Sequence, residues 1–144
     1  MNTLLSKCLR LLFAATLGLV LTVSVVPTAS ASDHGCTTGY TCLYKDAGYS
    51  GGQIDFQWYI PNLDNFFFEG TYTWGGEEVS STINLGTAYN ACLFSETGGH
   101  GTHLELAKGN HTVALSRYYW NDKAKSAYFR SYTENWMSCK PQKL

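Results

Sequence analysis

The sequence has 144 residues, a formal net charge of −1 and 44% hydrophobic residues. This charge balance disfavours a nucleic-acid partner, which would favour a basic surface. The zinc-peptidase motif H-E-x-x-H and a glycine-rich phosphate loop leading into a helix are both missing from the sequence. We therefore expect a protein that is not an enzyme.

Residues 1–31 have the pattern of a signal peptide. Lys7 and Arg10 precede an apolar run from Leu11 to Val26, and Ala29-Ser30-Ala31 fits a signal peptidase site. A membrane anchor is the alternative, but the run is short for a span of about 20 residues. We expect secretion to the extracellular space and a mature chain of residues 32–144. That chain forms one domain and, once the signal is cleaved, has no membrane attachment.

Four cysteines remain after the signal peptide, which would remove Cys8: they are Cys36, Cys42, Cys92 and Cys139. An even number in an exported domain predicts two disulfides rather than a zinc site, for which C-x-x-C spacing is absent. Sequence alone permits three pairings. A local Cys36–Cys42 loop is sterically reasonable and would leave Cys92 with Cys139.

Alternating apolar residues predict β-strands. Ile54, Phe56, Trp58 and Ile60 would share one face of a strand, and glycine pairs separate this region from the next. The long connection 61–73 contains Phe66-Phe67-Phe68, which is either part of the core or an exposed contact patch. We expect it to fill the core, because soluble proteins rarely expose large contiguous apolar patches.

An internal repeat indicates a duplicated fold. The sequence CLYKDAGYSGGQIDF (42–56) returns as CLFSETGGHGTHLEL (92–106), with four of the fifteen positions identical. Each copy is followed by a turn led by tryptophan, Trp74 or Trp120. One copy cannot bury its apolar face alone. The repeat therefore predicts an all-β Greek-key sandwich of two motifs, about 40–84 and about 90–140.

The spacing Tyr44-x4-Tyr49-x-Gly51 resembles the Greek-key signature of the βγ-crystallins. In that family the aromatics pack on a folded hairpin and the glycine permits its tight bend. The second copy has Phe94 and Gly101 at matching positions, with Gly99 in place of the second aromatic.

The run Cys36-x5-Cys42-Leu43-Tyr44, together with Trp120-Asn121-Asp122, is similar to a narrower group. This group is the secreted actinobacterial proteins of the streptomycete metalloproteinase inhibitor family. The resemblance implies an inhibitor that binds an extracellular peptidase, and we expect a monomer. No inhibitory residue is assigned from the sequence.

The same resemblance implies candidate calcium sites, because the calcium-binding turns of the family have the pattern N/D-N/D-x-x-S/T-S. A hydroxyl from one turn and an acid or amide from the other would bind the cation. We expect one weak calcium site, formed by Ser80, Asn121, Asp122 and Glu78. No cofactor is expected to be required. The other site places Lys125 at the hydroxyl position, and its ammonium would repel a divalent cation.

Two other functions remain open. One is a structural or stress-related calcium-binding domain without a peptidase target, and the weaker one is a secreted antimicrobial or cell-wall-active protein. His100, His103 and Glu105 form a further polar group, but they lack a recognised metal-ligand spacing. We interpret them as a solvent-facing strand.

Overall fold

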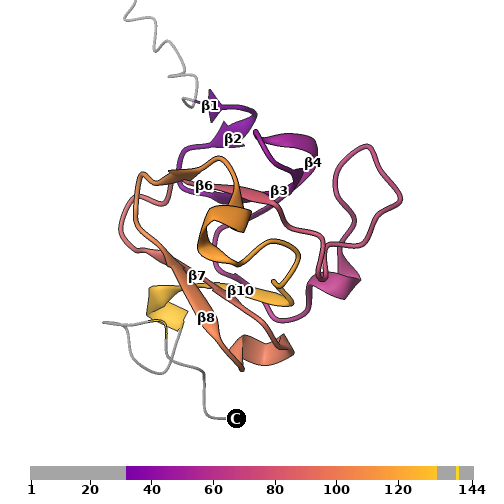
Figure 1. The fold of residues 1–144 in the computed structure, drawn as a ribbon. Helices are drawn as coiled ribbons and strands as arrows, with labels where there is room; N and C mark the ends of the chain where they lie inside the picture. Colours follow the sequence, from indigo (N-terminus) through magenta and orange to yellow (C-terminus); the bar gives the residue numbers. More distant parts are fainter. Residues whose placement is uncertain (1–31, 133–138, 140–144) are drawn as a thin grey trace, which may run out of the picture.

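The computed structural model describes residues 32–132 and residue 139, and its main body is two antiparallel sheets of four strands (Figure 1). The first sheet has the order β4-β3-β6-β9, formed by β4 (Ser50–Phe56), β3 (Thr41–Asp46), β6 (Ser81–Asn84) and β9 (His111–Thr112). The second has the order β5-β10-β7-β8, formed by β5 (Tyr59–Ile60), β10 (Ser126–Phe129), β7 (Ala91–Phe94) and β8 (His103–Leu106). The all-β sandwich predicted from the sequence is confirmed.

Smaller elements complete the fold. A two-stranded ribbon of β1 (Ser32–Asp33) and β2 (Cys36–Thr37) precedes the sheets. The described residues also form four short 3-10 helices: η1 (Leu63–Asn65), η2 (Thr97–Gly99), η3 (Leu115–Tyr118) and η4 (Arg130–Tyr132). Within the described ranges, no helix is long and apolar enough to cross a membrane. The expected signal peptide, residues 1–31, lies outside the described residues.

Each half of the chain supplies one strand to the other half's sheet. β9 pairs with β6, with Thr112 opposite Thr82, and β5 pairs with β10, with Ile60 opposite Ala127. A strand that pairs across the halves leaves its own motif incomplete. The duplicated motifs therefore close a single sandwich together.

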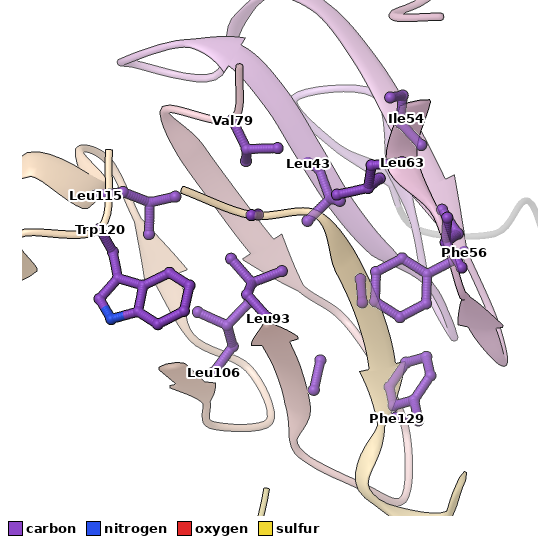
Figure 2. Close-up of a cluster of buried hydrophobic side chains, with 14 of the residues drawn as sticks. Leu43, Ile54, Phe56, Leu63, Val79, Leu93, Leu106, Leu115, Trp120 and Phe129 are labelled. Carbon is purple, nitrogen blue, oxygen red and sulfur yellow. The ribbon is translucent and has the colours of Figure 1, made fainter. Parts of the chain in front are cut away.

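Buried side chains from both sheets and their connections fill the space between the layers (Figure 2). Phe56 and Phe129 meet with ring centroids 5.5 Å apart. The core also includes Leu43, Ile54, Leu63, Phe68, Val79, Leu93, Leu106, Leu115 and Trp120. Burial of this apolar surface is the main force that holds the layers together.

The alternation predicted for residues 54–60 breaks after Phe56. β4 ends there, and a bend at 57–58 separates it from β5 in the other sheet. Trp58 is consequently 60% exposed, whereas Ile60 returns to the core at 2%. The prediction that Trp58 shares one strand face with Phe56 and Ile60 is wrong because the chain changes sheets within the apparent strand.

The disulfides join Cys36 to Cys42 and Cys92 to Cys139, with S–S distances of 2.07 and 2.05 Å. Cys42 and Cys92 occupy equivalent places in β3 and β7, and both are fully buried. The first is bonded to the ribbon that precedes its hairpin, and the second to the segment that follows β10. Of the three pairings left open by the sequence, the structure contains this one.

The two hairpins fold over in the same way despite their different aromatics. The ring of Tyr49 lies edge-on to Tyr44 at 5.7 Å, and Gly51 has φ +78°. In the second hairpin Gly99 replaces the second aromatic residue. The ring of Tyr128 lies edge-on to Phe94 there, with ring centroids 5.8 Å apart. A Cβ at Gly99 would lie 3.3 Å from the Tyr128 ring. The missing aromatic is thus replaced from β10.

One serine fastens each folded hairpin. The Ser81 hydroxyl donates to the Asp46 carbonyl at 2.6 Å and accepts from the Tyr49 N–H at 3.0 Å. The Ser126 hydroxyl repeats both bonds, to the Glu96 carbonyl at 2.7 Å and from the Gly99 N–H at 3.0 Å. Both serines are buried, so water does not replace these partners.

We predict that Ser126→Ala and Ser81→Ala each lower the free energy of unfolding by about 1–3 kcal/mol, because each leaves buried backbone groups without a partner. Urea unfolding of each variant measures the change. Ser116→Ala, at an exposed serine, is the control and should stay within about 0.5 kcal/mol of wild type. Equal stability of all four proteins would show that the serine bonds do not fasten the hairpins.

Alkaline pH should weaken the fold through Tyr44. Burial, aided by the nearby Asp33 carboxylate, raises the pKa of Tyr44 from 10.0 to about 12, and its hydroxyl donates to the His34 carbonyl at 3.0 Å. Because the pKa is higher in the folded state, the stability linked to it is complete below pH 10 and is lost as the pH rises towards 12.

We therefore predict that the unfolding free energy of Tyr44→Phe falls less steeply above pH 10 than that of the wild type. Burial also raises the pKa of Tyr128, so part of the alkaline decline should remain. Urea unfolding at a series of pH values measures the slopes, with the exposed Tyr72→Phe as control. Identical slopes for wild type and Tyr44→Phe would contradict the prediction.

Candidate functional site

The two tryptophan-led turns face each other across the sandwich and are joined by reciprocal backbone bonds. The Glu77 N–H donates to the Ala124 carbonyl at 2.9 Å, and the Asp122 N–H donates to the Val79 carbonyl at 3.1 Å. Glu77 and Asp122 also share a left-handed backbone, with φ of 59° and 54°. Residues 76–81 and 121–126 are therefore equivalent in register.

The expected calcium residues are partly brought together by this arrangement. The Ser80 hydroxyl donates to Asp122 Oδ1 at 3.2 Å, and Asn121 Nδ2 donates to Asp122 Oδ2 at 2.5 Å. Glu78 is exposed and, in the part of the chain that the structure describes, makes no hydrogen bond or ion pair with this group. Ser80, Asn121 and Asp122 thus form the cluster, without Glu78.

The mirror position is occupied by an ion pair. Lys125 Nζ lies 3.3 Å from Glu77 Oε1, so the ammonium stands where the other site has the Ser80 hydroxyl. Both side chains are partly exposed, and such a pair adds little stability. Its effect is to place a positive charge at the position of the second predicted calcium site.

The oxygen atoms of Ser80 and Asp122 fit a hard cation, but a single carboxylate suits only weak binding. Within residues 32–132 and 139, no three His, Cys, Asp or Glu side chains are grouped to hold a metal. Glu105 is engaged by Asn90 and Arg130, while the His103 ring lies against Phe94 at 6.0 Å. His100, His103 and Glu105 are therefore not gathered as ligands.

A serine pattern in the first hairpin also has a structural explanation. Gly48-Tyr49-Ser50-Gly51-Gly52 has the spacing G-x-S-x-G, which in hydrolases marks a nucleophile between a strand and a helix. Here it lies in the β3–β4 hairpin, and the Ser50 hydroxyl donates to the Ala47 carbonyl at 3.2 Å. The required strand-to-helix context is absent from this hairpin.

The long connection of the first motif exposes aromatic rings that we expected to be buried. Of the three phenylalanines expected to fill the core, only Phe68 is fully buried, while Phe66 and Phe67 are 43% and 45% exposed. The Phe67 ring stacks on Trp74, with centroids 3.7 Å apart. We call residues 66–74 the aromatic loop.

Trp74 and Trp120, which we expected to be equivalent, are not. Counting back from Glu77 and Asp122 places Gly75, not Trp74, opposite Trp120. Trp120 is buried at 9% in the core, whereas Trp74 is 49% exposed on the aromatic loop. The sequence does not indicate the one-residue offset, because a tryptophan precedes each turn.

A second aromatic surface lies around a shallow pocket of about 220 Å³. Trp58 and Tyr89 line it, together with Gly86, Thr87 and Phe129. No carboxylate, histidine or cysteine lines this pocket among the described residues, so it does not have the features of a reactive site.

The family comparison matches residues 87–139 to peptidase inhibitor family I36. A comparison with curated proteins gives no significant match. The family match points to a non-enzymatic protein with a peptidase-inhibitor-like role.

Solved structures show the same fold at low sequence identity. One is a βγ-crystallin domain from a structure described as "Evolution of the eye lens beta-gamma-crystallin domain fold". It has a TM-score of 0.55 and 20% identity, and the match covers 64% of this chain and 85% of that chain. A βγ-crystallin from Ciona intestinalis has a TM-score of 0.50 and 18% identity, covering 63% and 99%. A βγ-crystallin from an archaeon has a TM-score of 0.50 and 11% identity, covering 65% and 99%. The chain thus has a Greek-key fold of the βγ-crystallin type, and residues 87–139 of its second motif match peptidase inhibitor family I36.

Proposed function

We propose that this protein is a secreted inhibitor that binds the active-site cleft of an extracellular peptidase, with metallopeptidases as the first class to test. The observation that carries the proposal is the match of residues 87–139 to an inhibitor family. The leader-like residues 1–31 and the two disulfides support export to an oxidising compartment. The protein acts as a monomer.

The rigidity of the fold suits this role. An inhibitor that is already ordered loses little conformational entropy when it binds, so more of its contact energy appears as affinity. Here each hairpin is fastened by a buried serine, and a disulfide ties each half to a neighbouring segment. A peptidase that meets such a surface finds no extended, flexible substrate.

We predict that the full chain, expressed for secretion, inhibits at least one peptidase in a panel of a thermolysin-like metallopeptidase, subtilisin, chymotrypsin and trypsin. Initial rates with a chromogenic substrate give the inhibition constant, which we expect at about 1 μM or below. The reduced and alkylated protein is the control and should inhibit poorly, because its cross-links are gone. No inhibition of any panel member at about 10 μM would refute the proposal.

A weak calcium site is the second function that we propose. It is favoured by the 3.2 Å contact between the Ser80 hydroxyl and Asp122, which brings the two turns' oxygen ligands together. Asn121 adds an amide beside them. Calcium there would link the two motifs and stiffen the sandwich rather than take part in a reaction.

We predict that 10 mM calcium raises the unfolding free energy by about 1–3 kcal/mol over chelator, as expected for about 10- to 100-fold excess over the dissociation constant. The melting temperature measures the effect. Asp122→Asn and Ser80→Ala should abolish it, whereas Glu77→Gln, in the ion-paired turn, should retain it. A wild-type melt that is the same in calcium and in chelator would exclude the site.

A further inference from the structure

We propose that the aromatic loop, led by Tyr72, is the element that enters the peptidase cleft, and that it selects peptidases with an apolar primary pocket. This inference rests on the proposed inhibitory function and assigns it to a part of the chain outside the family-matched residues 87–139. Figure 1 shows the loop projecting from the side of the sandwich beside η1.

The length of the loop is not explained by the fold. Leu63 and Leu115 are equivalent, since their N–H groups donate to the Lys125 and Ser80 carbonyls, both at 2.8 Å. Four residues (116–119) connect Leu115 to Trp120, but eleven (64–74) connect Leu63 to the equivalent Gly75. The second motif completes the same connection without the extra residues. The first motif therefore carries an excursion that the sandwich does not need for closure.

The base of the loop is held in one conformation. The Gly75 N–H donates to the Phe66 carbonyl at 2.8 Å, and the Phe68 N–H donates to the Thr73 carbonyl at 3.1 Å. The Glu69 N–H donates to the Gln53 carbonyl of β4 at 2.8 Å. Phe68 anchors the loop in the core. The loop backbone also packs closely on β4, since a Cβ at Gly52 would lie 2.4 Å from the Glu69 carbonyl oxygen.

The tip of the loop is also ordered by its own side chains. The Thr71 hydroxyl donates to the Phe68 carbonyl at 2.9 Å and accepts from the Thr73 N–H at 3.1 Å. The stacked rings of Phe67 and Trp74 close the loop below the tip. A loop fixed in this way presents its tip without a large entropic cost on binding.

Tyr72 is the residue that this scaffold presents. Its side chain is 97% exposed, and among the described residues it makes no hydrogen bond or ring contact. Burial of a tyrosine by a partner is a frequent source of binding energy at protein interfaces. An exposed aromatic on a rigid projection is therefore suited to insertion into a pocket.

The chemistry of the loop indicates the class of pocket. Residues 66–74 contain five aromatics and one charged side chain, Glu69, and they have no lysine or arginine. A trypsin-like pocket, which holds an aspartate for a cationic side chain, has nothing to bind here. An apolar pocket matches Tyr72, with Phe66 and Trp74 available to cover the rim.

The test compares inhibition constants of Tyr72→Ala, Tyr72→Phe and Tyr89→Ala against the most strongly inhibited panel peptidase. We expect Tyr72→Ala to weaken inhibition about 30-fold or more and Tyr72→Phe to stay within about threefold of wild type. Tyr89→Ala is the matched control: this tyrosine is also exposed, at 44%, but it lines the separate pocket beside Trp58. Melting temperatures verify that all variants fold.

The outcomes separate the two proposals. Wild-type inhibition that persists in folded Tyr72→Ala would overturn the role of the loop and leave the inhibitory function standing. Loss of inhibition in Tyr89→Ala with retention in Tyr72→Ala would move the contact to the pocket and also overturn it. Absence of inhibition by the wild type would refute the proposed function itself.

Discussion

The hydrogen bonds that exchange strands between the two motifs are the interaction on which the rest of the structure depends. Because β9 completes the first sheet and β5 completes the second, neither half can bury its apolar face alone. The reciprocal bonds of Glu77 and Asp122 repeat this exchange at the turns. A short chain thereby obtains one shared core, and two disulfides add covalent restraint.

The two motifs differ at several equivalent positions, and contacts elsewhere in the sandwich compensate for these differences. Gly99 lacks the aromatic of Tyr49, and Tyr128 supplies a ring from the neighbouring strand. Lys125 replaces a hydroxyl, and Glu77 neutralises it. These differences are compensated within the sandwich. The aromatic loop is different, since the second motif has no equivalent of it and the Tyr72 side chain at its tip is 97% exposed. A partner outside the molecule is the physical explanation that we propose for this exposure.

Period-two alternation and the repeat predicted the sandwich because both are local signals of strand and hairpin. The sequence misled where the chain changes layer or register. Trp58 has the strand pattern but sits at a change of sheet, and Trp74 resembles Trp120 while lying one position away from it. The exposure of Tyr72 was not predictable, because it depends on hydrogen bonds between residues 66 and 75 that no local pattern encodes. Ser80 and Asp122 were paired only through the family resemblance.

Amide hydrogen exchange of the complex tests the central claim, that a fold completed by strand exchange presents the aromatic loop to a peptidase. The protein is compared alone and with an excess of a catalytically inactive peptidase whose cleft is open. The account predicts slower exchange concentrated in residues 66–74, with little change in the hairpin 92–106. Protection of that hairpin or of residues 85–90, with exchange of residues 66–74 unaltered, would contradict it.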